Sequence, residues 1–257
     1  MVELSPRFWE IFFEVFDELP RQGPGNRTSA ARALELCADL HEAPAILDVG
    51  CGVGAQTLHL AELTMGSIIA FDKHTPSIRR LQATIAERGL SQRIKAVVGD
   101  MAAPEQPLGS FDLIWSEGAL YSIGLRKALE VYHGLLRSDG YLAFTDAVWR
   151  KADPPAAVRA SFDLDYPTMG TVEDVLKALS DCGFELVGHF TLPDEAWWED
   201  FYTPMEAHIA NLRVKYANDA EAMVILDQLA EEPEMHRRYA DYYAYEFFVS
   251  RPIRSES

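Results

Sequence analysis

Hydrophobic positions near the start of the chain repeat with the spacing of two amphipathic helices. Over residues 7–19 apolar side chains recur every three or four positions, and acidic residues fill the other face. A turn rich in glycine and proline follows at 20–26, and a second helix is expected from Thr28 to Leu40, capped by Thr28 or Ser29. The first helix could pair with another chain, lie on a membrane or fold back as a lid. Its acidic face argues against anionic lipid, and we favour the lid.

From Pro44 onward, short apolar runs alternate with helical spacing. The runs predict strands at 45–49, 67–71, 94–98, 111–115, 140–145, 184–190 and 243–250. Helices are predicted at 55–64, 76–88, 125–137 and 171–182, the last of them ending at Gly183. This alternation predicts an α/β fold, with a doubly wound, mostly parallel sheet of seven strands and helices on both of its faces.

The stretch between the last two predicted strands is too long for a hairpin. Residues 193–241 hold an aromatic cluster and two helical patterns, near 204–216 and 219–230. We therefore interpret the stretch as a helical insertion that roofs the site. The chain is expected to be a single domain with four parts: an N-terminal helical cap (1–43), a core (44–192), the helical insertion (193–241) and the last strand with its tail (242–257).

Composition limits the class of protein further. The chain has 257 residues and a formal net charge of −17, which argues against nucleic-acid phosphate as a partner. It has no apolar run of about 18 residues and no basic, apolar leader, so we expect no membrane partner and a cytoplasmic location. Its 3 cysteines and 7 histidines show neither a disulfide framework nor metal-ligand spacing, so no metal is expected.

The most informative motif joins the first predicted strand to the helix after it. It reads Leu47-Asp48-Val49-Gly50-Cys51-Gly52-Val53-Gly54. A glycine turn between a strand and a helix N-terminus is where open α/β sheets hold nucleotide-like cofactors. A carboxylate at the end of this strand would repel a dinucleotide diphosphate and attract the ammonium and sulfonium of S-adenosylmethionine. The glycine spacing also fits the dinucleotide fingerprint, which keeps a NAD-dependent oxidoreductase as an alternative.

Further signals follow at the carboxyl ends of the next strands. Asp72 can accept hydrogen bonds from both ribose hydroxyls, Asp100 can accept from an adenine amine, and Met101 offers an apolar surface to the ring. Each of them alone could be a helix cap or a loop residue, but the ordered set predicts an adenosyl site. The expected cofactor-binding residues are Arg21, Asp48, Gly50, Cys51, Gly52, Gly54, Gln56, Asp72, Lys73, Asp100, Met101, Trp115 and Ser116.

These motifs resemble those of the class I S-adenosylmethionine-dependent methyltransferases. The resemblance covers about 44–191 and the last strand, and Arg21-Gln22-Gly23-Pro24-Gly25 is similar to a bacterial subgroup with no substrate that we can assign. It implies the strand order 3-2-1-4-5-7-6 with an antiparallel last strand. It also implies S-adenosylmethionine as the cofactor and S-adenosylhomocysteine as its product. The insertion at 193–241 departs from the minimal family pattern, so the acceptor is not carried over.

Methyl transfer is an in-line displacement, and it needs an aligned nucleophile in a dry site. Residues beyond the methyl group should lie at the ends of the fourth and fifth strands, where Glu117 and Asp146 are candidate bases, although each could also be an ordinary loop acid. Arg21 is expected to meet the cofactor carboxylate. Aromatic faces can hold an apolar or cationic acceptor. The expected substrate walls are Tyr121, Trp149, Tyr166, Trp197 and Tyr202.

The sequence thus predicts a monomeric or homodimeric enzyme that moves a methyl group from S-adenosylmethionine to a small-molecule acceptor by direct displacement. A non-catalytic adenosyl-binding sensor or partner subunit is the alternative from a different class of function. The acceptor atom (nitrogen, oxygen, sulfur or carbon) stays open.

Overall fold

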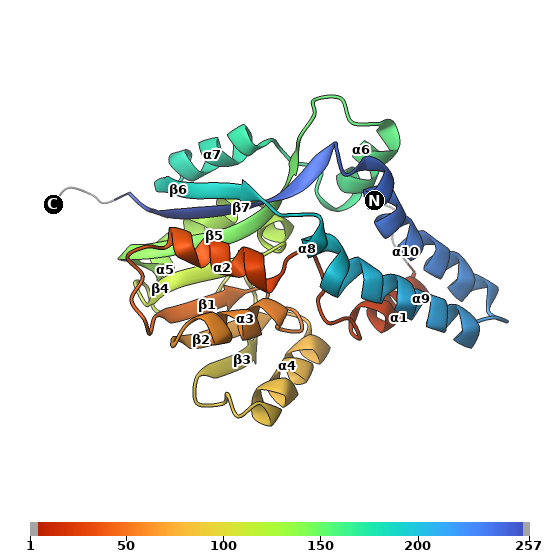
Figure 1. The fold of residues 1–257 in the computed structure, drawn as a ribbon, viewed down its shortest axis with the longest axis horizontal. Coiled ribbons are helices and arrows are strands. Elements are labelled where there is room, and N and C mark those ends of the chain that lie inside the picture. Colours follow the sequence, from red (N-terminus) through yellow and green to blue (C-terminus); the bar gives the residue numbers. More distant parts are fainter. Residues whose placement is uncertain (1–4, 254–257) are drawn as a thin grey trace.

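A seven-stranded sheet in the order β3-β2-β1-β4-β5-β7-β6 forms the centre of the computed structural model, which describes residues 5–253 (Figure 1). Strands β1 to β5 run parallel, and β7 runs antiparallel to both β5 and β6. The expected order and the reversed last strand are confirmed. The strands are β1 (Ala45–Val49), β2 (Ser67–Asp72), β3 (Ile94–Val98), β4 (Phe111–Glu117), β5 (Leu136–Trp149), β6 (Phe184–Thr191) and β7 (Tyr243–Pro252).

Helices cover both faces of the sheet, as the alternating pattern predicts. Helices α2 (Arg27–Leu36), α3 (Ala55–Leu63) and α4 (Thr75–Glu87) share one buried core with one face. Helices α5 (Leu125–Leu135) and α7 (Val172–Asp181) share a second core with the other face. Strand β4 lies between these layers and is buried along its whole length, so its carboxyl end is held rigidly.

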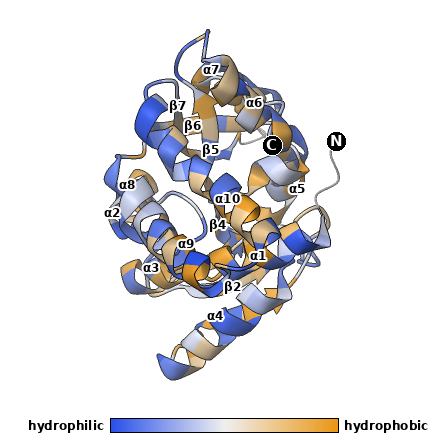
Figure 2. Cartoon of the chain, turned by 90° about the vertical axis from the view of Figure 1, so that its right-hand side faces the viewer, coloured by the Kyte–Doolittle hydropathy of each residue, from blue (hydrophilic) through white to orange (hydrophobic). Residues whose placement is uncertain are grey.

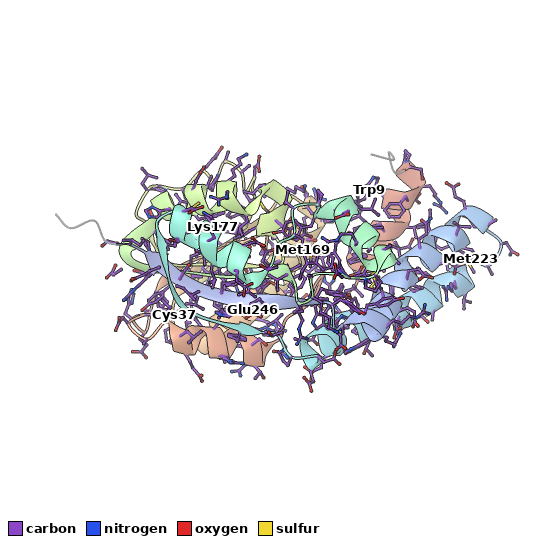
Figure 3. The ribbon with its side chains drawn as sticks, turned by 90° about the horizontal axis from the view of Figure 1, so that it is seen from above. Trp9, Cys37, Met169, Lys177, Met223 and Glu246 are labelled. Atoms are coloured by element: carbon purple, nitrogen blue, oxygen red, sulfur yellow. The ribbon has the colours of Figure 1, made fainter. Side chains whose placement is uncertain are left out.

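A third apolar core lies beyond the carboxyl ends of the parallel strands. It joins the ends of β5 and β7 to a group of helices that we call the helical lobe. Figure 1 shows the lobe on the right, beyond the ends of the strands, and Figure 2 looks onto it. In Figure 3 the lobe carries Trp9 and Met223, at the end of the molecule away from Cys37. The lobe consists of α1 (Pro6–Phe16), α6 (Ala156–Asp165), α8 (Glu195–Trp197), the π-helical turn η2 (Trp198–Tyr202), α9 (Thr203–Lys215) and α10 (Ala220–Tyr239).

Local side-chain caps explain where several helices begin. Ser5 accepts a hydrogen bond from the amide of Phe8 at the start of α1, and proline occupies the first turn, where its missing N–H costs nothing. Thr171 and Asp174 form a reciprocal capping box at the start of α7. Gly183 follows that helix with φ +80°, as its predicted role requires.

Several boundaries differ from the expectation, and three of them have a local explanation or consequence. Helix α2 is capped by Asn26, whose side chain accepts from the amide of Ser29 at 2.8 Å, rather than by Thr28 or Ser29. Helix α5 ends at Leu135, because the next residues already pair with β4 as the start of β5. Helix α10 continues through Pro233 to Tyr239, although a proline inside a helix removes one backbone hydrogen bond.

Four short elements were not expected, among them α8 and η2 at the start of the insertion. Helix α6 follows β5, and the 3-10 turn η1 (Leu120–Ile123) follows β4. Across residues 5–253 no helix combines the length and the apolar character needed to cross a bilayer.

Candidate active site

A cavity of about 620 Å³ lies where the carboxyl ends of the parallel strands meet the helical lobe. One end is lined by the turn after β1 and by residues 21–24, and the other end by α6, η2, α10 and β7. Three phenylalanines of α1 line it as well, at positions 12, 13 and 16. A ligand that fills the cavity would therefore contact the glycine turn and the lobe together.

The glycine turn is fixed by two side chains from outside it. The amide of Gly52 donates to Asp72 Oδ2 at 3.0 Å, and the amide of Val53 donates to Gln22 Oε1 at 3.2 Å. Gly52 has φ +51°, and a Cβ on it would lie 2.5 Å from Gln22 Oε1. Only glycine therefore allows the backbone and Gln22 to approach this closely.

Asp72 ends β2 and lines the cavity beside this turn. Its carboxylate accepts from the amide of His74 at 2.8 Å as well as from Gly52. A carboxylate has about four acceptor positions, so Asp72 keeps capacity for a ligand hydroxyl. His74 also anchors α1 here, since its ring stacks on Phe13 with 4.2 Å between centroids and its Nε2 lies 3.1 Å from Asp17.

Asp48 lies behind the turn, not in front of it. Its side chain is fully buried, and the carboxylate accepts from the hydroxyl of Thr57 and from the side-chain amide of Gln56 on α3. Burial raises the pKa of Asp48 to about 7, while the hydrogen bond from Thr57 opposes that shift. The expected direct attraction between Asp48 and a cationic ligand is therefore replaced by a role in tying β1 to α3.

Arg21 and Glu117 form a buried ion pair at the centre of the site. Arg21 Nη2 lies 2.5 Å from Glu117 Oε2, and both side chains are at most 4% exposed. The other carboxylate oxygen of Glu117 accepts from Trp115 Nε1 at 2.8 Å. Arg21 also donates to the carbonyls of Gly23 and Pro24. Its remaining terminal nitrogen, Nη1, is buried and has no hydrogen-bond partner among residues 5–253.

Aromatic side chains line the lobe end of the cavity and form what we call the aromatic chamber. The rings of Tyr121 and Tyr166 stack at 5.0 Å, and the rings of Trp197 and Tyr245 meet edge to face at 5.1 Å. Such a wall excludes water and offers ring faces to an apolar or cationic guest. The chamber residues are Tyr121, Phe162, Tyr166, Trp197, Tyr202, Tyr243 and Tyr245.

Comparison with known proteins assigns this architecture. Residues 46–140 match the family described as methyltransferase domain. The chain is 25% identical over 162 residues to a sterol 24-C-methyltransferase of Pneumocystis carinii, covering 60% of this chain and 43% of that protein. A Saccharomyces cerevisiae sterol 24-C-methyltransferase is 24% identical over 65% of this chain and 46% of its own length. The chain thus spans less than half the length of these two relatives.

The matched segment, residues 46–140, contains the glycine turn and the ends of β2 and β4, and it is similar to a methyltransferase domain. The fold of the chain also matches methyltransferases of Geobacter sulfurreducens and Thiobacillus denitrificans, both crystallised with S-adenosylhomocysteine. Each has a TM-score of 0.79, covers 98% of this chain over its own full length, and is 17% or 16% identical. The cyclase SpnF has the same fold, with a TM-score of 0.70, 21% identity, and coverage of 89% of this chain and 82% of its own. The fold therefore does not by itself fix the reaction.

The cavity contains many of the residues expected from the sequence. They come from the segment before α2, the glycine turn, the ends of β2 and β4, and the helical lobe. These residues are Arg21, Gly50, Cys51, Gly52, Gln56, Asp72, Lys73, Glu117, Tyr121, Tyr166, Trp197 and Tyr202.

Other expected residues lie behind the cavity wall. Asp146 accepts from the hydroxyl of Tyr166 at 2.9 Å, and burial raises its pKa to about 7. Trp149 donates its indole N–H to the carbonyl of Met169, and Ser116 donates its hydroxyl to the carbonyl of Val49. The residues outside the lining are Asp48, Gly54, Asp100, Met101, Trp115, Ser116, Asp146 and Trp149.

Asp100 and Met101 lie on the loop after β3. Asp100 is exposed, and its carboxylate accepts from the amide of Ala102 at 2.8 Å. A Cβ on Gly50 would come within 3.3 Å of the Met101 methyl group, which places Met101 beside the glycine turn. The loop therefore borders the turn from outside the cavity.

Several lining residues were not expected from the sequence. Gln22 directly follows Arg21 in the Arg-Gln-Gly-Pro-Gly motif, so the expected role of Arg21 could have indicated that Gln22 also lines the site. Tyr243 and Tyr245 alternate along β7, a pattern that equally suits an ordinary buried strand face. Glu232 comes from α10, where no local motif marks it. Among residues 5–253, no group of three His, Cys, Asp or Glu side chains is placed to hold a metal ion.

Proposed function

We propose that this protein transfers a methyl group from S-adenosylmethionine to a small-molecule acceptor by direct displacement. The observation that carries the proposal is the single cavity that joins the glycine turn to the aromatic chamber. A donor held at the turn and an acceptor held in the chamber would share one enclosed space. Enclosure favours displacement because it aligns the two reactants and removes water.

The residues at the turn fit the donor. Arg21 Nη1 is a buried cationic donor without a hydrogen-bond partner in the described part of the chain, and a ligand carboxylate would satisfy it. Asp72 has acceptor capacity for ribose hydroxyls, and we assign Asp100 and Met101 to the adenine ring from their place beside the turn. When bound, S-adenosylmethionine supplies an electrophilic methyl group on a sulfonium.

The protein residues then bind, orient and exclude water. Glu117 has both oxygens engaged, one by Arg21 and one by Trp115, so we assign it the positioning of Arg21 instead of the role of base. Asp146 positions Tyr166 in the same way, from behind the chamber wall. Helix α1 acts as the lid over the donor, and the segment 193–241 acts as the roof over the acceptor.

Two other functions use the same fold. A dinucleotide oxidoreductase loses support because the segment matching a methyltransferase domain includes the glycine turn. A non-catalytic adenosyl-binding protein would keep the turn and leave the chamber without an acceptor. The size and aromatic lining of the chamber favour an enzyme over that sensor.

Calorimetric titration of the protein with S-adenosylhomocysteine and with NAD tests the cofactor. We expect S-adenosylhomocysteine to bind, and Asp72→Ala to weaken it by about 1–3 kcal/mol, because hydrogen bonds to a charged group are lost. Asp153→Ala, in an exposed loop, is the matched control. Binding of NAD with no binding of S-adenosylhomocysteine would overturn the assignment.

Transfer itself is tested separately, with a radiolabelled methyl donor and a pool of small metabolites. Label should move to a small molecule. If the donor binds and no label moves to any component of the pool, the non-catalytic sensor is the better description.

A further inference from the structure

The two ends of the cavity differ in charge. Its basic lining residues, Arg21, Lys73 and His74, all belong to the end beside the glycine turn. The lobe end contributes Asp165 from α6 and Glu231 and Glu232 from α10. Across the described residues that line the cavity, no lysine, arginine or histidine comes from the helical lobe. A negatively charged acceptor would therefore meet like charge in the chamber.

Glu232 is the carboxylate that faces the aromatic chamber. Its Oε1 accepts a hydrogen bond from the hydroxyl of Tyr202 at 3.2 Å. No basic side chain in the described part of the chain lies within ion-pair distance of it. The chamber thus presents an acidic group that has no cationic partner in the described part of the chain, and such a wall attracts a cationic guest.

Glu232 lines the cavity beside the aromatic side chains of the chamber. Desolvation raises its pKa to about 7, and the nearby charge of Asp165 acts in the same direction. Burial raises the pKa of Tyr121, Tyr202, Tyr243 and Tyr245, and the charge of Glu232 acts in the same direction on each of them. Aromatic faces around a carboxylate form the kind of pocket that takes an organic ammonium group.

We propose that the acceptor is an amine, held by Glu232 and the rings of the aromatic chamber. The inference rests on the proposed methyl transfer and names the class of substrate for it. An uncharged acceptor would leave the Glu232 carboxylate without a counter-ion. An ammonium group neutralises Glu232 and lies against ring faces at the same time.

The reaction balances with the groups present. An amine enters as its ammonium form and gives one proton to Glu232. The nitrogen lone pair then forms the new bond to the methyl carbon as the carbon–sulfur bond breaks, and the electron pair of that bond stays on sulfur. The product is a methylated ammonium ion, which leaves with its charge, while Glu232 returns its proton to solvent after product release.

The test compares an amine with the neutral alcohol of the same shape. Choline and 3,3-dimethyl-1-butanol differ only in whether nitrogen or carbon carries the three methyl groups. Each is titrated calorimetrically into the full-length protein, with and without S-adenosylhomocysteine. We expect the cation to bind at least about tenfold more tightly than the alcohol.

Glu232→Gln is the discriminating variant, because glutamine has the same shape and can still accept from Tyr202. It should lower the affinity for choline about tenfold and leave the affinity for the alcohol unchanged. Glu234→Gln is the control on the same helix, since its carboxylate pairs with Arg237 and Arg238 at the surface. It should change neither affinity.

Equal binding of choline and the alcohol by the unaltered protein would overturn the proposal, and so would a Glu232→Gln variant that keeps the preference. The comparison of the two probes needs no variant, so a folding defect leaves the test intact. A protein that prefers choline and fails to bind S-adenosylhomocysteine would refute the proposed function and leave the cation site standing. A protein that binds S-adenosylhomocysteine and shows no preference for choline would refute only the proposal that the acceptor is an amine.

Discussion

Arg21 Nη2 and Glu117 Oε2 lie 2.5 Å apart in the interior and join the segment before α2 to the end of β4. Removing one partner of a buried pair leaves the other charge uncompensated. We expect Glu117→Ala to lower the free energy of unfolding by about 3–5 kcal/mol in urea titrations, with Glu117→Gln less severe. Glu62→Ala breaks the exposed pair with Arg27 and should cost at most about 1 kcal/mol. Equal losses of unfolding free energy in Glu117→Ala and Glu62→Ala would contradict a stabilising role for the buried Arg21–Glu117 pair.

Gly25 makes that ion pair sterically possible. Its φ is +143°, and a Cβ on it would lie 2.4 Å from both Arg21 Nη2 and Glu117 Oε2. Gly25→Ala should lower the free energy of unfolding by at least about 1–3 kcal/mol from backbone strain alone. Gly23→Ala is the matched control, because nothing lies within 4 Å of its Cβ position. Urea denaturation should give a clearly lower free energy of unfolding for Gly25→Ala than for Gly23→Ala. Similar free energies for the two variants would show that the segment around Arg21 can shift to make room for the added methyl group.

Substitution of Phe13 tests whether α1 acts as a lid that retains the ligand. Phe13 lines the cavity from α1 and stacks on His74, beside the glycine turn. Phe13→Ala should raise the dissociation rate of S-adenosylhomocysteine about 5–10-fold, since an aromatic contact is worth roughly 1 kcal/mol. Glu10→Ala, on the exposed face of the same helix, should leave that rate unchanged in stopped-flow measurements. A rate that stays the same in Phe13→Ala would mean that α1 does not retain the ligand.

Asp146 gives the protein a dependence of stability on pH. Its pKa is raised from 3.8 to about 7, so the native state binds this proton more tightly than the unfolded state. Its contribution to stability is therefore full below about pH 4 and falls as the pH rises towards 7. Asp146→Asn removes the titration and keeps an acceptor for Tyr166.

The free energy of unfolding of the Asp146→Asn variant should therefore exceed that of the wild type, by an amount that grows from pH 4.5 to pH 8. The gain should be on the order of 2–4 kcal/mol, because one pKa unit corresponds to about 1.4 kcal/mol. Asp48 has a similar shift but is present in both proteins, so it cancels in the comparison. A difference in free energy of unfolding between the two proteins that does not change with pH would contradict the raised pKa of Asp146.

Much of the fold followed from local patterns. Every predicted strand is present within a few residues. Apolar runs of this length, bounded by turn residues, are typical of strands. The strand order came from the family resemblance and is confirmed. Helix α6 was missed because its short segment has only one buried residue, Val158, and so shows almost no periodicity.

The donor end of the site was more predictable than the acceptor end. Glycine turns and strand ends are local features, and Gly52 and Asp72 are found where the sequence places them. Asp48 was assigned to the wrong side. Side chains two positions apart in a strand lie on the same face of the sheet, so Asp48 lies on the face of Ile46, which α3 covers. This alternation could have been applied to the sequence. Glu232 was not predictable, because only the packing of α10 within the helical lobe, against α1 and α9, brings it to the cavity.

The division of the cavity has a consequence for how such a protein changes over time. The donor end is built from residues 21–24, the ends of β1, β2 and β4, and α1, whereas most of the opposite wall comes from α6 and from the chain after β6. These stretches of sequence are separate, so mutations can remodel one without touching the other. New acceptors can therefore be acquired through α6, η2 and α10 while the machinery for the common donor is inherited unaltered.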